Sequence, residues 1–206
     1  ASQNLRRHGA ALGNLGAAYQ VMSDLSQAIA CFKEHLAISE EIQDPQGEIN
    51  ALTNLGNAYQ ALGEYTKAIY YLRHRLAIAQ TLADRQSEAQ ILGSLRSAYT
   101  TIGDLIQANE SHQQQLVIAR ELLLTTASDD IITSLKLLGL NPAEDLVGAN
   151  LSQLDLSHAD LSNANLSRAI LKEADLKFAS LSHAKLSNAC LAHARLGNAN
   201  LRDADL

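Results

Sequence analysis

The C-terminal part of the chain, residues 149–206, carries a leucine at every fifth position. Twelve leucines follow one another at this spacing, from Leu151 to Leu206. The residue two positions before each of them is alanine in every unit except one, where it is Leu154. A period of five fits neither an α-helix, whose side chains repeat every 3.6 residues, nor a strand, whose side chains alternate. The backbone of this part must therefore turn once every five residues.

This pattern resembles the pentapeptide-repeat family, whose fold is a right-handed four-sided β-helix. The resemblance implies that each unit forms one side of a coil, that Leu and the small Ala point inward, and that the other three positions point outward. One coil then takes about 20 residues, and neighbouring coils lie about 4.8 Å apart. Leu156, Leu176 and Leu196 are expected to stack in one buried column.

A second repeat, with a period of 40 residues, occupies the N-terminal part. The segment NLGAAY at 14–19 recurs as NLGNAY at 54–59 and as SLRSAY at 94–99. Leu55, Tyr59 and Leu62 are spaced four and three residues apart, which indicates a helix rather than a strand. Breaks at Gly63 and Gly103 separate two such runs, because glycine accepts the left-handed conformation that ends a helix. Each unit therefore predicts a helix, a tight turn and a second helix.

The pattern Leu-Gly-x-x-Tyr followed by alanine resembles the tetratricopeptide repeat. Its length resembles the 40-residue variant seen in kinesin light chain and in repeat arrays of bacterial signalling proteins. The resemblance covers about residues 9–124. The third unit departs from the pattern, because Arg96 replaces the packing glycine and His112 stands where the other units have Phe32 and Leu72.

The two repeats predict a multi-domain chain, α followed by β. A tetratricopeptide helical superhelix of three repeats is expected over residues 1–124, and a linker with a short capping helix over 125–148. The right-handed quadrilateral β-helix of about three coils is expected over 149–206.

The capping helix is expected from Asp129 to Leu138. Ser128 or Asp129 can cap its start, and Gly139 can end it. We expect this helix to cover the first coil, because an uncovered coil would show unpaired backbone.

Composition excludes several functions. The net charge is −6, with 10 basic and 16 acidic residues before residue 149 and 6 of each after it. Neither part has the basic surface of a nucleic-acid binder. No apolar run approaches the roughly 18 residues that span a membrane. Two cysteines, Cys31 and Cys190, show no pairing pattern, which favours a reducing compartment and a cytoplasmic protein.

No catalytic or cofactor-binding motif occurs in the sequence, which predicts that the chain is not an enzyme and binds no cofactor. A 20-residue coil would align the polar residues of two outward columns, which could be taken for metal or acid–base sites. They are Asn163, His183 and Asp203 in one column and Gln153, Glu173 and His193 in the other. We expect solvated surface and no metal, because zinc needs three or four convergent ligands and one column offers two good ones.

The tetratricopeptide resemblance implies that the first helix of each repeat lines a concave groove that holds peptides. The residues carried over to this groove are Asn14, Gln20, Asn54, Asn57 and Gln60. Amide side chains can pair with peptide backbone at a smaller desolvation cost than charges. The alternative is an ordinary polar surface. A further contact patch is predicted at Ile170 and Phe178, which are apolar residues at outward positions.

These features favour a non-catalytic scaffold for protein–protein interaction, in which the helical array binds a protein or peptide partner and the β-helix is a rigid spacer or second docking face. One alternative is a regulatory or recognition arm of a larger signalling ATPase or protease, since the chain starts at Ala1 without Met and stops within a repeat. A DNA-mimicking topoisomerase inhibitor is disfavoured, because residues 149–206 are neutral and such a mimic needs a long acidic face.

The open last coil also predicts a homodimer through that coil, or a chain that continues beyond Leu206.

Overall fold

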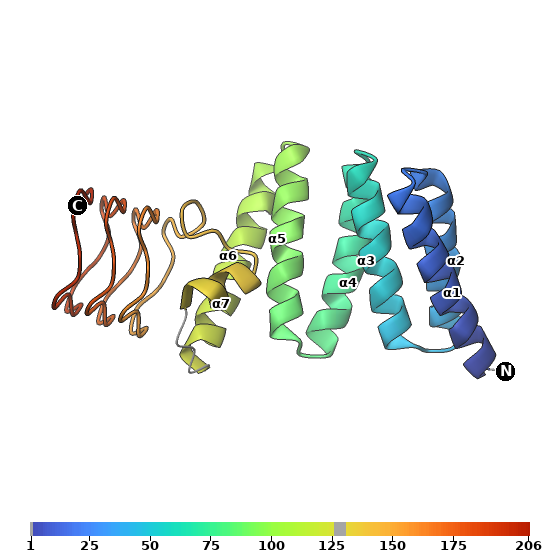
Figure 1. The fold of residues 1–206 in the computed structure, drawn as a ribbon, viewed down its shortest axis with the longest axis horizontal. Helices are drawn as coiled ribbons and strands as arrows, with labels where there is room; N and C mark the ends of the chain where they lie inside the picture. Colours follow the sequence, from blue (N-terminus) through green and yellow to red (C-terminus); the bar gives the residue numbers. More distant parts are fainter. Residues whose placement is uncertain (1, 126–130) are drawn as a thin grey trace. The chain divides into compact units, whose positions relative to one another are not determined.

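The protein is described by a computed structural model that covers residues 2–125 and 131–206 (Figure 1). The chain divides into two compact units, residues 1–84 with 94–111 and residues 85–93 with 112–206. The division passes through helices α5 (Arg85–Thr101) and α6 (Leu105–Thr125). The predicted domain boundaries stay a prediction.

The first unit contains a helical array. Its helices are α1 (Ser2–Val21), α2 (Leu25–Glu41), α3 (Pro45–Ala61) and α4 (Tyr65–Thr81), and consecutive ones pack against each other. The first helices of the two repeats, α1 and α3, are also in contact. The helix–turn–helix unit predicted from the 40-residue period is therefore confirmed (Figure 1).

The core of this array is built from the repeated small and aromatic positions. Phe32, Leu55 and Ala68 are completely buried in one apolar cluster. Gly16 lets α1 approach α2, because a Cβ atom there would lie 2.7 Å from Cδ1 of the Phe32 ring. A Cβ atom on Gly56 would lie 3.5 Å from the Leu72 side chain, which is an ordinary van der Waals distance. The packing glycine is thus required in the first repeat and only convenient in the second.

The turns between paired helices need a left-handed residue. Gly63 and Gly103 have φ values of 79° and 80°, and Ser23 occupies the corresponding position with φ of 63°. Asp24 then caps α2 by accepting a hydrogen bond from the Gln27 amide at 3.1 Å. These residues fix where each second helix begins.

The second unit contains α7 (Ile131–Leu137). The predicted start of this helix, with Ser128 and Asp129 as its caps, lies outside the described residues. Gly139, at φ of 76°, follows the helix end as expected.

The C-terminal part of this unit is a stack of coils (Figure 1). Isolated parallel bridges join residues 20 positions apart, for example Asn150 to Ile170 and Ile170 to Cys190. The described residues form these bridges without any longer strand, so the coil length agrees with the prediction, whereas the right-handed quadrilateral β-helix stays a prediction.

Leucine and alanine fill the inside of the coils. Leu166, Leu171, Leu176 and Leu181 are completely buried, as is Ala174 beside them. Hydrogen bonds join each coil to the next. The backbone amide of each of these four leucines donates to a carbonyl 19 residues later, at a distance of 2.8 Å.

The fifth position of every unit has a left-handed backbone. Its φ values run from 55° at Asp203 to 62° at Gln153 and are all positive in between. Aspartate or asparagine before the central leucine often accepts a hydrogen bond from the amide two residues later, as Asp155 does from Ser157 at 3.0 Å. This local bond closes the corner.

The two ends of the stack differ in how far they are covered. The first coil begins at Leu146, which is completely buried, and the Asn165 amide bonds to the Pro142 carbonyl at 2.9 Å. At the other end Leu196 and Leu201 are partly exposed. Gly148, just before the first predicted unit, also has a left-handed backbone, with φ of 69°, and its amide donates to the Ser167 carbonyl at 2.9 Å.

Candidate partner-binding pocket of the helical array

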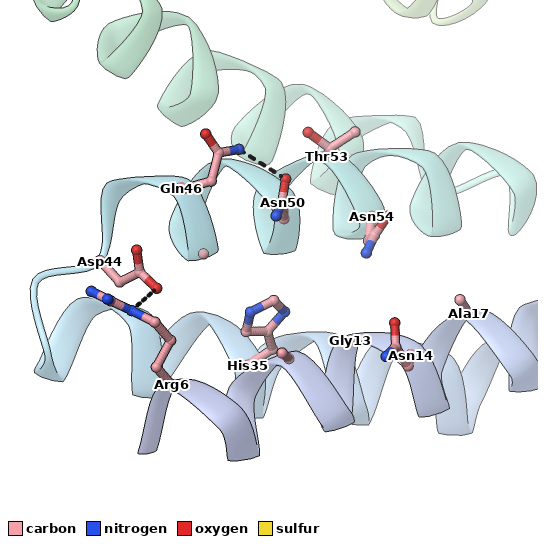
Figure 2. A pocket seen from close by; sticks show the side chains of 12 residues that line it. Arg6, Gly13, Asn14, Ala17, His35, Asp44, Gln46, Asn50, Thr53 and Asn54 are labelled. Carbon is pink, nitrogen blue, oxygen red and sulfur yellow. Dashed lines mark hydrogen bonds and ion pairs between the residues drawn. The ribbon is translucent and has the colours of Figure 1, made fainter. Parts of the chain in front are cut away.

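A polar hollow in the first unit lies between α1, α2 and α3 (Figure 2). Its volume is about 630 Å³. Side chains that carry hydrogen-bonding groups surround it: Arg6, Asn14, His35, Asp44, Gln46, Asn50, Thr53 and Asn54. We call this hollow the α1–α3 pocket.

Two of the five predicted groove residues line this pocket. Asn14 lies on α1 and Asn54 on α3, at the same place in successive repeats. Gln20, Asn57 and Gln60 do not line it; Asn57 is exposed and the two glutamines are half-buried nearer the ends of their helices. The groove prediction for those three residues stays a prediction.

Two pairs of polar side chains in the pocket, one of them charged, already bond to each other. Arg6 Nε donates to Asp44 Oδ2 at 2.9 Å, and Gln46 Nε2 donates to Asn50 Oδ1 at 3.2 Å (Figure 2). The remaining lining is neutral amide and hydroxyl. Such a surface suits a neutral polar group, as peptide backbone is, better than a free ion.

His35 is the buried polar residue of the pocket. Only 7% of its surface is exposed, and its Nδ1 has no hydrogen-bond partner within the described part of the chain. Figure 2 shows its ring pointing into the space between α1 and α3. The ring fits because Gly9 and Gly13 carry no side chains; a Cβ atom on Gly13 would lie 3.0 Å from Nδ1.

Burial also decides the charge of this ring. It lowers the pKa of His35 below its usual value, and the nearby Asp44 carboxylate opposes this only in part. The ring is therefore neutral at pH 7, with one N–H group. A neutral ring in this pocket can donate one hydrogen bond to a ligand but offers no charge.

Sequence reasoning missed Arg6, His35, Asp44, Gln46 and Asn50. A signal for His35 was present in the 40-residue register, which places His35, Arg75 and Gln115 at one position. That position is polar in all three repeats although Leu36, its neighbour, is apolar in all of them. Each of the three side chains has a buried atom with no partner among the described residues.

The comparisons with known proteins bear on both repeats. The family model described as Tetratricopeptide repeat matches residues 7–81. The family model described as Pentapeptide repeats (8 copies) matches residues 145–179 and 179–206. The chain carries tetratricopeptide repeats followed by pentapeptide repeats. Both kinds of repeat are generally non-catalytic.

A solved structure shares the helical fold. It is the crystal structure of the tetratricopeptide domain of FLU from Arabidopsis, with a TM-score of 0.51 and 24% identity. The match covers 55% of this chain and 95% of that one. No curated protein matches the chain. The likeness to FLU shows the fold of the tetratricopeptide array and nothing further.

Within the part of the chain that the structure describes, one group of metal-ligand side chains lies in the tetratricopeptide array, and sequence reasoning did not single it out. Ligand atoms of Glu40, Glu48 and His74, from three different helices, lie within 4.8 Å of one another. His74 Nε2 lies 3.3 Å from a Glu48 oxygen, so these two already form a pair. Three donors reach only the lower limit for a zinc site, and two of the three already contact each other.

The polar columns of the pentapeptide repeats are brought together as the 20-residue register predicts. Gln153 Nε2 donates to Glu173 Oε2 at 3.0 Å, and His183 lies 3.9 Å from Asp203. These columns occupy the left-handed corner position, which asparagine, aspartate and histidine tolerate better than most residues. The backbone conformation therefore favours the asparagine, aspartate and histidine residues of these columns, but it does not account for Gln153 and Glu173.

Ile170 and Phe178, the predicted outer patch, lie in different columns. Ile170 is bridged to Asn150 and Cys190, whereas the Phe178 ring stacks on His158 at a centroid distance of 5.0 Å. The corner at Glu173 comes between them along the coil. A shared patch at these two residues stays a prediction.

Two remaining sequence expectations concern thiols and membranes. Cys31 is buried and Cys190 is exposed, and both are free thiols. Among the described helices, none has the length and apolarity needed to cross a lipid bilayer.

Proposed function

We propose that the chain is a non-catalytic scaffold whose tetratricopeptide array binds a segment of a partner protein. Tetratricopeptide domains generally mediate protein–protein interaction. The observation that supports this proposal is the α1–α3 pocket, whose neutral amide lining and buried His35 offer hydrogen bonds in a hollow of about 630 Å³.

The pentapeptide repeats serve in this proposal as a rigid spacer or second docking face in the form of a β-helix. The continuous ladder of bonds between coils supports rigidity, because each coil is tied to the next on every side. A homodimer through the last coil and a cytoplasmic location remain proposals, and a regulatory or recognition arm of a larger signalling ATPase or protease remains the alternative function.

Peptide display tests the binding role. The full chain is used to select peptides from a random library, with an Asn14→Leu, Asn54→Leu variant as the matched control. We expect enriched peptides that bind the wild type and lose most of their affinity for the variant, because the two amides line the pocket. Failure to enrich any peptide, or equal binding to both proteins, would contradict the proposal.

A further inference from the structure

The third repeat shows how this array holds a piece of backbone. Gln90 Nε2 donates to the Leu137 carbonyl at 2.8 Å, and Gln115 Nε2 donates to the Leu138 carbonyl at 2.8 Å. Gln115 also reaches the Gly139 carbonyl at 3.4 Å. These three consecutive carbonyls lie at the C-terminal end of α7, where a helix has no internal donors left. Two amide side chains of the array therefore satisfy the end of a helix.

This contact depends on glycines on both sides. A Cβ atom on Gly93 of α5 would lie 2.8 Å from Gln115 Nε2, so a larger residue would displace that amide. On the other side Gly139 has φ of 76°, and a Cβ atom there would lie 3.4 Å from the same nitrogen. Position 93 therefore requires glycine because of the close approach of Gln115, whereas position 139 favours glycine because of its positive φ.

The first repeat has the same arrangement without the helix end. Gly13 and His35 stand two repeats before Gly93 and Gln115 in the 40-residue register. As at Gly93, a Cβ atom on Gly13 would lie close to the polar atom opposite, at 3.0 Å from His35 Nδ1. The second repeat differs, because Thr53 replaces the glycine and donates to the Ile49 carbonyl of its own helix.

We infer that the α1–α3 pocket binds the C-terminal end of a helix from a partner protein, with His35 Nδ1–H donating to a last-turn carbonyl as Gln115 does to Leu138. The inference rests on the proposed function and names the class of segment bound. By analogy with Gly139, the partner helix ends in glycine.

The probe is a synthetic peptide of residues 131–141 of this chain, IITSLKLLGLN, added to the full chain. Nitrogen-15 spectra of the histidine side chains report on His35 directly, and fluorescence anisotropy of the labelled peptide gives its affinity. We expect saturable binding that shifts the Nδ1–H signal of His35. A peptide with the same residues in scrambled order is the control for non-specific association.

Variants at His35 test whether its side chain donates a hydrogen bond to the ligand or only lines the pocket. His35→Gln introduces the third-repeat residue and keeps a donor, so affinity should stay within about threefold, whereas His35→Leu should weaken binding about tenfold, as loss of one hydrogen bond does. Gly13→Ala, which places a methyl group against Nδ1, gives a second variant if His35→Leu unfolds, and it should weaken binding similarly. Equal affinity of wild type, His35→Leu and Gly13→Ala would overturn the inference.

The outcomes also distinguish this inference from the proposed function. Library peptides that depend on Asn14 and Asn54, together with no binding of the 131–141 peptide, would overturn the helix-end occupant and leave the scaffold standing. The same result follows if proline-rich peptides, which cannot form a helix end, show an equal dependence on His35.

Discussion

At the scale of single residues, the repeats differ from each other where the sequence pattern looks the same. Gly16 and Gly56 occupy one register position, yet only Gly16 faces a ring that leaves no room for a methyl group. His35, Arg75 and Gln115 share another position, and of these His35 faces the α1–α3 pocket. These differences decide the energetic role of each residue.

The two packing glycines should respond differently to alanine. Both substitutions gain about 1 kcal/mol of helix propensity, but Gly16→Ala must also displace Phe32, at a cost of about 1–3 kcal/mol. We therefore expect Gly56→Ala to be neutral or stabilising and Gly16→Ala to be the less stable of the two by about 1–3 kcal/mol. Urea unfolding of both variants measures the difference. Equal midpoints would show that the Phe32 ring moves aside freely.

His35 should make folding stability depend on pH. Burial lowers its pKa in the folded state, so below about pH 6.5 the unfolded chain takes up a proton that the folded chain does not. Stability is therefore complete above that pH and falls as the pH is lowered towards the folded pKa. Urea midpoints at pH 7.5 and 5.5 should drop less in His35→Gln than in the wild type, since the other histidines titrate in both.

At the scale of elements, each five-residue side of a coil combines a buried central leucine, the rung, with a strained fifth residue, the corner. The rung is leucine, stacked on leucines 20 residues before and after it. The corner requires a left-handed residue whatever side chain the sequence supplies, from Gly148 to Asp203. Stability of the stack should follow these two positions rather than the outward polar ones.

Removal of one rung tests the first position. Leu176 is completely buried, and the coil register places it between Leu156 and Leu196. Leu176→Ala should cost about 2–5 kcal/mol. Lys185→Ala, at an exposed bridge position, should cost under about 0.5 kcal/mol. Similar losses in a denaturation series would mean that the inward face has been assigned wrongly.

Substitution at a corner tests the second position. Arg168 is exposed and has φ of 62°. Asparagine adopts this conformation more readily, so Arg168→Asn should stabilise the chain by about 0.5–1 kcal/mol. Thermal unfolding should show a rise in midpoint for this variant, and an unchanged or lower midpoint would argue that the corner is not strained.

At the scale of the whole molecule, both parts are repeat arrays in which each unit packs on its sequence neighbours. Stability in such arrays is approximately a sum of repeat terms and nearest-neighbour interfaces. The tetratricopeptide and pentapeptide repeats should therefore contribute separately to the free energy of unfolding.

Combining one substitution from each array tests this separation. Gly16→Ala and Leu176→Ala belong to different compact units. Their effects on the free energy of unfolding should add within about 0.5 kcal/mol in the double variant. A coupling energy well above that value would show that the two arrays stabilise each other.

The sequence alone determined both repeats, their order and the inward leucines, because a strict period leaves few ways to bury the repeated apolar positions. The expectation that Asn14 and Asn54 face a groove came from the tetratricopeptide resemblance, and both residues line the α1–α3 pocket. Only the tertiary structure shows that His35 is buried with Nδ1 unpartnered among the described residues, because this depends on how Gly9, Gly13 and the neighbouring helices pack around the ring. It likewise showed that the outward polar columns occupy left-handed corners, because φ is a property of the folded backbone and not of the side-chain type.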